Sequence, residues 1–258
     1  MTETSTVDEQ PGIPARSQTD VVIAGIKGMI TDGRLGPGSR LPIERDLAAE
    51  LSVSRGSLRE GVRALAILGV LETRQGDGTY VTSLDPAQLL SPLGILAELH
   101  TPAHAGHLLA VRRVLEAESA ALAASGITDD DLGVLDGILD EVDEILTSDP
   151  DMDLERFIDT DTAFHRRIAQ ASGNPALAGM VDSLVGRTHR ARLWRAITER
   201  GTVRETQAEH RAILAELRAH DPERARIRMA VHILGVEEFA TAHADETQVP
   251  GEGDLAPA

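Results

Sequence analysis

The chain has 258 residues, a formal net charge of −17 and no cysteine, so disulfides, thiolate metal ligands and thiol nucleophiles are excluded. Only 2% of the residues are aromatic against 41% hydrophobic, so the core is built mainly from Leu, Ile, Val and Ala, a composition that favours helices. The N-terminal segment is polar and acidic and does not have the pattern of a secretory signal, and no stretch reaches the roughly 20 apolar residues of a membrane span, which predicts a cytoplasmic protein without a membrane partner.

The charge is unevenly distributed along a chain that is long enough for two domains. Of the 25 basic and 42 acidic residues, residues 1–83 hold 9 and 11, which leaves 16 and 31 for residues 84–258. Residues 20–83 alone contain 8 of each kind. Because the acidic remainder repels polyanions, any nucleic acid is bound by the first 83 residues.

The first 83 residues are predicted to contain three helices and a hairpin. Residues 1–19 are polar and carry two prolines, which indicates a disordered arm. Apolar residues at helical spacing follow Asp20, and a second short helix follows Pro42. Ser54 is the expected N-cap of a third helix that runs to about Leu68. The β-prone runs VLET and TYVTS flank a glycine-rich turn, so residues 20–83 have the layout of a winged helix-turn-helix.

Beyond a short linker every strong signal is helical, so residues 84–243 are predicted to form an all-α antiparallel bundle and residues 244–258 a disordered tail. The fold class is therefore mainly α, with a small β-hairpin wing. Breaks at Gly or Pro separate the expected helices, which span 87–99, 104–125, 129–147, 153–172, 176–199, 203–219 and 223–242.

Three arginines, Arg55, Arg59 and Arg63, are spaced four apart on the third helix and share one face. A solvated surface stripe is the simplest interpretation of such spacing. The preceding tight turn and the following hairpin favour another one, because a helix presented in this way fits the DNA major groove, where arginine pairs with guanine.

The segment LPIERDLAAELSVSRGSLREGVRAL with ETRQGDGTYV closely resembles the DNA-binding domain of the GntR family of bacterial transcription regulators. Two departures stand in the third helix: Gly56-Ser57 replaces a threonine-rich pair, and Gly61, at a cost of about 1 kcal/mol relative to Ala, replaces a usual Ala or Val. Arg63 is left open as a phosphate contact. The DNA contacts that the resemblance implies are Arg45, Ser54, Arg55, Ser57, Arg59, Gln75 and Gly76.

Four residues of the acidic part are candidate metal ligands. Asp161 and His165 are at i and i+4, so both leave one helical face, although a simple Asp–His hydrogen bond is the better explanation of this pair taken alone. His210 and His232 each lie 11 residues from the helix break at Asp221, so an antiparallel hairpin brings them level. Together the four suit a divalent ion such as Zn²⁺, Ni²⁺ or Mn²⁺.

The segments FHRRIAQASGNP, EHRAILAELRAHDPERA and AVRRVLEAESAALAA resemble the effector-binding FCD domain of the FadR subgroup of this family. The resemblance implies that Asp161, His165, His210 and His232 hold a metal, and that the metal helps to hold a small carboxylate effector. It implies an effector contact for Arg112, for which a structural salt bridge with a nearby acid is the alternative. The arginines in GRTHRARLWRAITER are expected to be solvated or paired with neighbouring carboxylates, and the alternative for some of them is to face the pocket.

These patterns predict a ligand-responsive transcription regulator, most simply a repressor, that binds a pseudo-palindromic DNA operator as a homodimer and is not an enzyme. The alternative is a metal-dependent enzyme acting on a small organic acid, because three histidines and a carboxylate also suit hydrolysis. Against it stand the attached DNA-binding domain and the lack of an evident general base beside the ligands.

Overall fold

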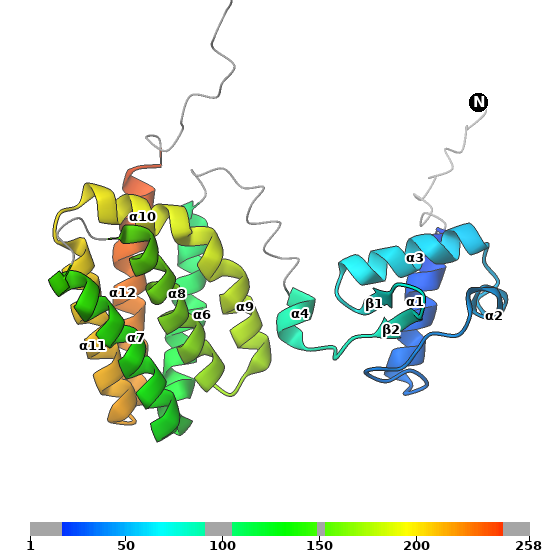
Figure 1. Ribbon diagram of the computed structural model, residues 1–258, viewed down its shortest axis with the longest axis horizontal. Coiled ribbons are helices and arrows are strands. Elements are labelled where there is room, and N and C mark those ends of the chain that lie inside the picture. Colours follow the sequence, from blue (N-terminus) through cyan, green and yellow to red (C-terminus); the bar gives the residue numbers. More distant parts are fainter. Residues whose placement is uncertain (1–16, 91–104, 149–152, 245–258) are drawn as a thin grey trace, which may run out of the picture. The chain divides into compact units, whose positions relative to one another are not determined.

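A computed structural model describes residues 17–90, 105–148 and 153–244 of the chain (Figure 1). It divides into two compact units, Met1–Leu84 and Asp85–Ala258, which are described separately. The predicted arm and tail lie outside the described residues, except at their inner ends. At the first of these ends a helix already begins at Gln18, because Ser17 and Asp20 form a reciprocal capping box.

The N-terminal unit confirms the predicted winged helix-turn-helix fold. Its helices are α1 (Gln18–Thr31), α2 (Glu44–Glu50) and α3 (Arg55–Ile67), followed by the antiparallel strands β1 (Leu71–Arg74) and β2 (Gly78–Val81). In the hairpin Leu71 is opposite Val81, and both side chains are buried. The helices and the hairpin close over one apolar core, which includes Val22, Ile26, Leu47, Leu58, Leu65, Leu71 and Val81.

Gly61 lies where α3 crosses α1 closely. A Cβ atom at this position would come within 2.5 Å of Val22 Cγ1 and 2.7 Å of Val22 Cβ. Val22 is fully buried, so it has no free space to move into. The expected helix-propensity cost of Gly61 is therefore offset by close packing of the two helices, which explains why a larger residue is absent.

We expect Gly61→Ala to lower the free energy of unfolding of the N-terminal unit by about 1–3 kcal/mol, because overpacking outweighs the gain in helix propensity. Gly56→Ala is the matched control on the same helix, since its Cβ would meet Ser54 Oγ at 3.6 Å, an ordinary contact. Urea unfolding of the full chain, combined with amide hydrogen exchange in α1 and α3, measures both variants. A Gly61→Ala variant as stable as the Gly56→Ala variant would contradict the packing argument.

The C-terminal unit is the predicted antiparallel helical bundle (Figure 1). Its core lies around Leu109, Phe164, Ile213 and Met229. Within the described ranges, none of the helices is both long and apolar enough to cross a membrane. The helical elements are α4 (Pro86–Leu90), α6 (Ala105–Gly126), α7 (Asp129–Ser148), α8 (Leu154–Ala171), α9 (Pro175–Val185), the 3₁₀ turn η2 (Gly186–Thr188), α10 (His189–Thr198), α11 (Thr202–Arg218) and α12 (Pro222–Ala242).

Two of the predicted helices need comment. Of the helix expected over 87–99, only the part before residue 91 lies within the described residues, where α4 begins at Pro86. The single helix expected over 176–199 is wrong, because η2 separates α9 from α10. At this break the carbonyl oxygen of Val185 accepts hydrogen bonds from Arg192 Nη2 at 2.8 Å and from Thr188 Oγ1 at 3.2 Å. In a continuous helix that oxygen would accept the amide of His189 instead.

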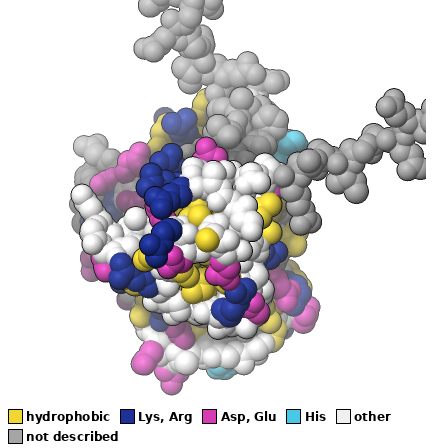
Figure 2. All heavy atoms as spheres, turned by 90° about the vertical axis from the view of Figure 1, so that its right-hand side faces the viewer, with side chains coloured by type: hydrophobic (Ala, Val, Ile, Leu, Met, Phe, Trp, Pro, Cys, Tyr) yellow, Lys and Arg dark blue, Asp and Glu magenta, His cyan; other side chains and the backbone are white. Residues whose placement is uncertain are grey.

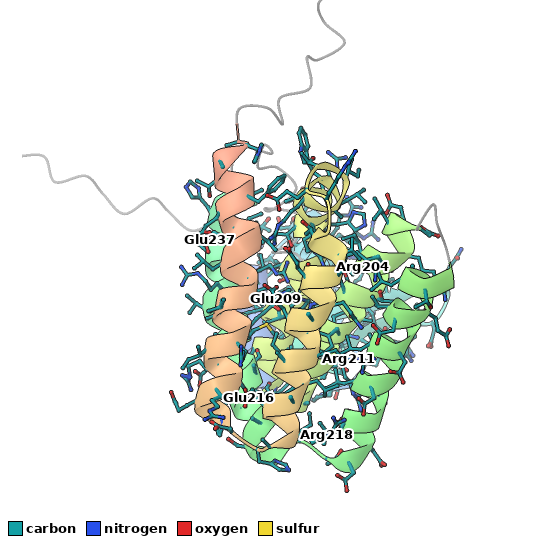
Figure 3. The ribbon with its side chains drawn as sticks, turned by 90° about the vertical axis from the view of Figure 1, so that its left-hand side faces the viewer. Arg204, Glu209, Arg211, Glu216, Arg218 and Glu237 are labelled. Atoms are coloured by element: carbon teal, nitrogen blue, oxygen red, sulfur yellow. The ribbon has the colours of Figure 1, made fainter. Side chains whose placement is uncertain are left out.

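A row of ion pairs links α11 to α7. Arg204, Arg211 and Arg218 recur every seven residues on α11 and point toward α7 (Figure 3). Arg211 Nη2 lies 2.5 Å from Asp140 Oδ1 and 2.6 Å from an oxygen of Asp143, and Arg218 pairs with another acid of α7. These contacts neutralise part of the acidic surface of α7, and each contributes at most about 1 kcal/mol because the partners are exposed to solvent.

Candidate metal centre and DNA-binding surface

The structure brings the four predicted metal ligands together inside the bundle. Asp161 and His165 come from α8, His210 from α11 and His232 from α12, and all four side chains are buried. Their ligand atoms lie within 4.8 Å of one another. The Nε2 atom of His232 is 3.2 Å from Nε2 of His165 and 3.2 Å from Nε2 of His210. Oδ1 of Asp161 lies 3.5 Å from Nε2 of His210, so four donor atoms converge on one point.

Two carboxylates behind the cluster determine which nitrogen of each neighbouring imidazole carries the hydrogen and which one presents a lone pair to the centre. Glu209 Oε2 is 2.8 Å from Nδ1 of His232, and Glu116 Oε2 is 2.5 Å from Nδ1 of His165. A carboxylate accepts a hydrogen bond, so each Nδ1 is the nitrogen that carries a hydrogen and each Nε2 is the nitrogen left to bind a cation through its lone pair. Two lone pairs that face each other at 3.2 Å repel, and a cation between them removes the repulsion.

Two of the imidazoles at the centre, those of His210 and His232, are electrically neutral near neutral pH. Burial lowers the pKa of His232 to about 4, although Glu209 opposes this shift. Burial, and after it the neighbouring His232, His165 and Arg192, hold the pKa of His210 well below its ordinary value. Neutral imidazole is the form that binds metals, so these residues can coordinate an ion without first losing a proton.

Asp161 offers one oxygen to the centre and uses the other in an ion pair. Its Oδ1 faces the histidines, whereas Oδ2 is paired with Nη1 of Arg192 on α10. Arg192 also donates to Thr162 Oγ1 at 3.0 Å and to the carbonyl of Val185. No specific role for Arg192 could be predicted from the sequence, since the only signal was its place among four arginines on one segment. The ion pair favours monodentate binding of a cation by Asp161.

Arg112 is fully buried beside the same centre and has the structural salt bridge that its sequence context allowed. Its Nε lies 2.6 Å from Glu116 Oε1, and its Nη1 lies 2.5 Å from Thr188 Oγ1. Burial alone would raise the pKa of Glu116, but Arg112 and His165 outweigh it and hold that pKa below its ordinary value. Nη2 of Arg112 has no hydrogen-bond partner among the described residues, so one donor remains for an anion.

The donor set fits a divalent cation. Three imidazole nitrogens and one carboxylate oxygen are the borderline ligands that Zn²⁺, Ni²⁺ and Mn²⁺ accept, and no thiolate competes with them. The outer carboxylates Glu116 and Glu209 were not identified from the sequence. Glu209 directly precedes the candidate ligand His210, so adjacency was the available signal. Glu116 stands four residues after Arg112, and only the tertiary packing of α6 on α8 brings it to His165.

The predicted DNA contacts lie on the surface of the N-terminal unit. Arg55, Arg59 and Arg63 are exposed on α3, and Arg45 is exposed on α2. Gln75 and Gly76 are exposed at the tip of the hairpin. Figure 2 shows Lys and Arg side chains gathered along one side of the face that this unit turns to the viewer, with acidic side chains beside them.

Local contacts orient several of these residues. Ser54 caps α3 by accepting the amide of Ser57 at 3.0 Å, and the two hydroxyls are 2.9 Å apart. Glu44 of α2 holds Arg59 through both Nε and Nη2 at 2.9–3.1 Å. Gly76 has a φ of 76°, a left-handed conformation that suits glycine in the turn. The capped start of α3 thus presents its arginines in a defined direction.

Comparison with known proteins gives matches in both units. The model of the bacterial regulatory proteins of the gntR family matches residues 18–81, and the FCD domain model matches residues 107–235. The HTH-type transcriptional regulator LutR of Bacillus subtilis (strain 168) is 32% identical over 223 residues, which cover 84% of this chain and 99% of that protein. The Glc operon transcriptional activator of Escherichia coli (strain K12) is 38% identical over 165 residues, 64% of this chain and 65% of that protein.

A solved structure agrees with these matches. Streptococcus agalactiae GntR superposes with a TM-score of 0.62 at 29% identity, covering 85% of this chain and 99% of that chain. The relatives are transcription regulators and not enzymes, so the alternative of a metal-dependent enzyme is set aside. This chain belongs to the GntR family of bacterial transcription regulators and combines its winged helix-turn-helix DNA-binding domain with an effector-binding FCD domain.

Proposed function

We propose that this regulator is a repressor that binds a pseudo-palindromic operator as a homodimer, and that a small carboxylate bound at a metal in the FCD domain controls its affinity for DNA. The observation that carries the proposal is the convergence of Asp161, His165, His210 and His232 beside a buried arginine. Because its target is bacterial DNA, we assign the protein to the cytoplasm.

The metal in this proposal is Zn²⁺, Ni²⁺ or Mn²⁺, held by the one aspartate and three histidines. Such ions accept more than four ligands or exchange water readily, so coordination positions remain for an effector oxygen. Arg112 is the proposed partner of the effector carboxylate, through its unpaired Nη2. The bound ion supplies positive charge that attracts and orients the carboxylate.

The effector controls DNA binding only if it binds two states of the dimer with different affinities. In the proposed mode the effector-bound state has the lower operator affinity, so the effector relieves repression. A thermal-shift screen of the metal-loaded protein against sugar acids, hydroxy acids and dicarboxylates tests this function. We expect a stabilising acid to shift the affinity for DNA as well. If no acid changes both stability and DNA affinity, the proposed control by a carboxylate is wrong.

Glu209→Ala is expected to weaken metal binding by about 10- to 100-fold, because the Nδ1 hydrogen of His232 then loses its acceptor. Figure 3 shows Glu209 on the side of α11 that faces α12. Glu205→Ala, one turn earlier on α11 and exposed, is the matched control. Competition with a chromophoric chelator measures both affinities. Equal metal affinity in the two variants would contradict the role of Glu209.

A further inference from the structure

The outer face of the α6–α12 pair is unusually apolar for so acidic a domain. Within α6, which the structure describes in full, the charged side chains that reach the surface are Arg113, at 36% exposure, and Glu118, at 47%, and both form ion pairs with α12. The exposed positions also include Val111 and Val114, the latter at 64% exposure. On α12 the exposed residues Ile227, Val231 and Leu234 recur at helical spacing.

These two stripes form one continuous surface. Arg113 Nε lies 2.8 Å from Glu237, and Arg226 Nη1 lies 2.9 Å from Glu118, so α6 and α12 run antiparallel. In this register Val114 and Val231 stand at about the same height. We place the residues of α6 and α12 on helical wheels with about 100° per residue. The exposed apolar residues of each helix then lie roughly 70–80° around its axis from the line along which the two helices touch, and both sets lie on the same side of the pair. Glu118 falls between Val111 and Val114 around α6, so the Arg226–Glu118 ion pair lies within this surface, and Arg228, 3.6 Å from Glu216, borders it on α12.

The sequence of α12 indicates what covers this surface. Arg224 lies seven residues before Val231 and Glu238 lies seven residues after it, and both are exposed. If a two-fold axis passes beside Val231, the α12 helices of two copies cross antiparallel, and Arg224 of each copy comes level with Glu238 of the other. A surface with an apolar centre, a positive end and a negative end is complementary to itself under that symmetry.

The net charge of residues 84–258 also bears on where a second copy of this chain can dock. Residues 84–258 carry 16 basic against 31 acidic residues, so two copies of this domain repel each other over most of their surface. On the α6–α12 face the exposed residues Val111, Val114, Ile227, Val231 and Leu234 offer apolar area that can be buried, and the charges of α6 are already paired. From these observations we infer that the α6–α12 face is the interface at which a second copy of this chain docks, with the two α12 helices antiparallel about Val231.

This inference rests on the proposed homodimer, and sedimentation equilibrium of the metal-loaded full chain tests the two separately. Val231→Arg places two like charges at the two-fold axis, so we expect the dimer dissociation constant to rise by about 100-fold or more. Val134→Arg is the matched control, because Val134 is 46% exposed on α7, away from this face. Both valines are exposed, so both variants are expected to fold, which circular dichroism verifies.

A charge exchange tests the orientation of the helices. Arg224→Glu and Glu238→Arg should each weaken the dimer by several-fold, about 3- to 10-fold, whereas the double variant should restore it. A monomeric wild type overturns the proposed homodimer itself. A Val231→Arg variant that stays as dimeric as Val134→Arg overturns the assigned face and is also the result expected if the N-terminal unit covers it. A double variant no stronger than the single ones overturns the antiparallel arrangement.

Discussion

Replacing His210 with alanine is expected to remove stoichiometric metal from the purified protein. Apparent binding free energies of about 10–16 kcal/mol, shared among four ligands, predict a loss of affinity on the order of 100- to 1000-fold for one ligand. The remaining three donors, Asp161, His165 and His232, cannot close the same site, because His210 is the ligand that α11 contributes. Elemental analysis of metal per chain, together with chelator competition, measures the change.

The His210→Ala variant should also lose the thermal stabilisation that bound metal gives to the wild type. A cation that binds only the folded state raises the unfolding temperature, and it also relieves the repulsion between the lone pairs of His165 and His232. His189→Ala is the control, since His189 contacts Glu155 at 3.1 Å and lies outside the cluster. A wild type that is neither loaded with metal nor stabilised by Zn²⁺, Ni²⁺ or Mn²⁺ would remove the metal from the proposal.

Removal of the guanidinium from Arg55 or Arg59 is expected to cost about 1–3 kcal/mol of specific DNA binding each, or roughly 5- to 150-fold in affinity. A duplex selected by the wild-type protein from a random library serves as the probe in a shift assay. Arg59 is already held by Glu44, so little freedom of its side chain is lost on binding. The loss should fall on particular base pairs of the selected site.

Alanine variants of two further arginines distinguish base recognition from phosphate contacts and from unrelated surface charge. Arg63→Ala is expected to weaken all sequences alike and to reduce the salt dependence by about one unit, as a phosphate contact does. Arg34→Ala is the control, because Arg34 pairs with Asp32 and Glu50 and is not part of α3. If Arg55→Ala and Arg59→Ala both keep the sequence preference of the wild type, α3 is not the recognition helix.

Much of the fold could be predicted because it depends on local spacing. Ser54 was expected as an N-cap and is one, since a serine after a turn satisfies free amides at a helix start. Asp161 and His165 share a face because i and i+4 always do in a helix. The break at Asp221 places His210 beside His232, because short connections produce antiparallel neighbours.

The features that were missed depend on contacts between distant segments. No strong signal in the local sequence predicts the 3₁₀ turn after Val185. At this turn the carbonyl oxygen of Val185 accepts hydrogen bonds from the side chains of Thr188 and Arg192. The approach of Glu116 to His165 requires α6 to pack on α8 in one rotation. Gly61 likewise looked unfavourable by helix propensity, whereas the contact with Val22 that demands it belongs to tertiary structure.

The placement of Val231 and His232 next to each other on α12 has a mechanical consequence. His232 points into the cluster, and Val231, about 100° further around the helix, is 59% exposed to solvent. A helix turns as a rigid rod, so any rotation of α12 that adjusts His232 to a ligand rotates Val231 by the same angle. At an interface built around Val231, each subunit would thereby transmit the state of its own centre to its neighbour without any intervening relay of side chains.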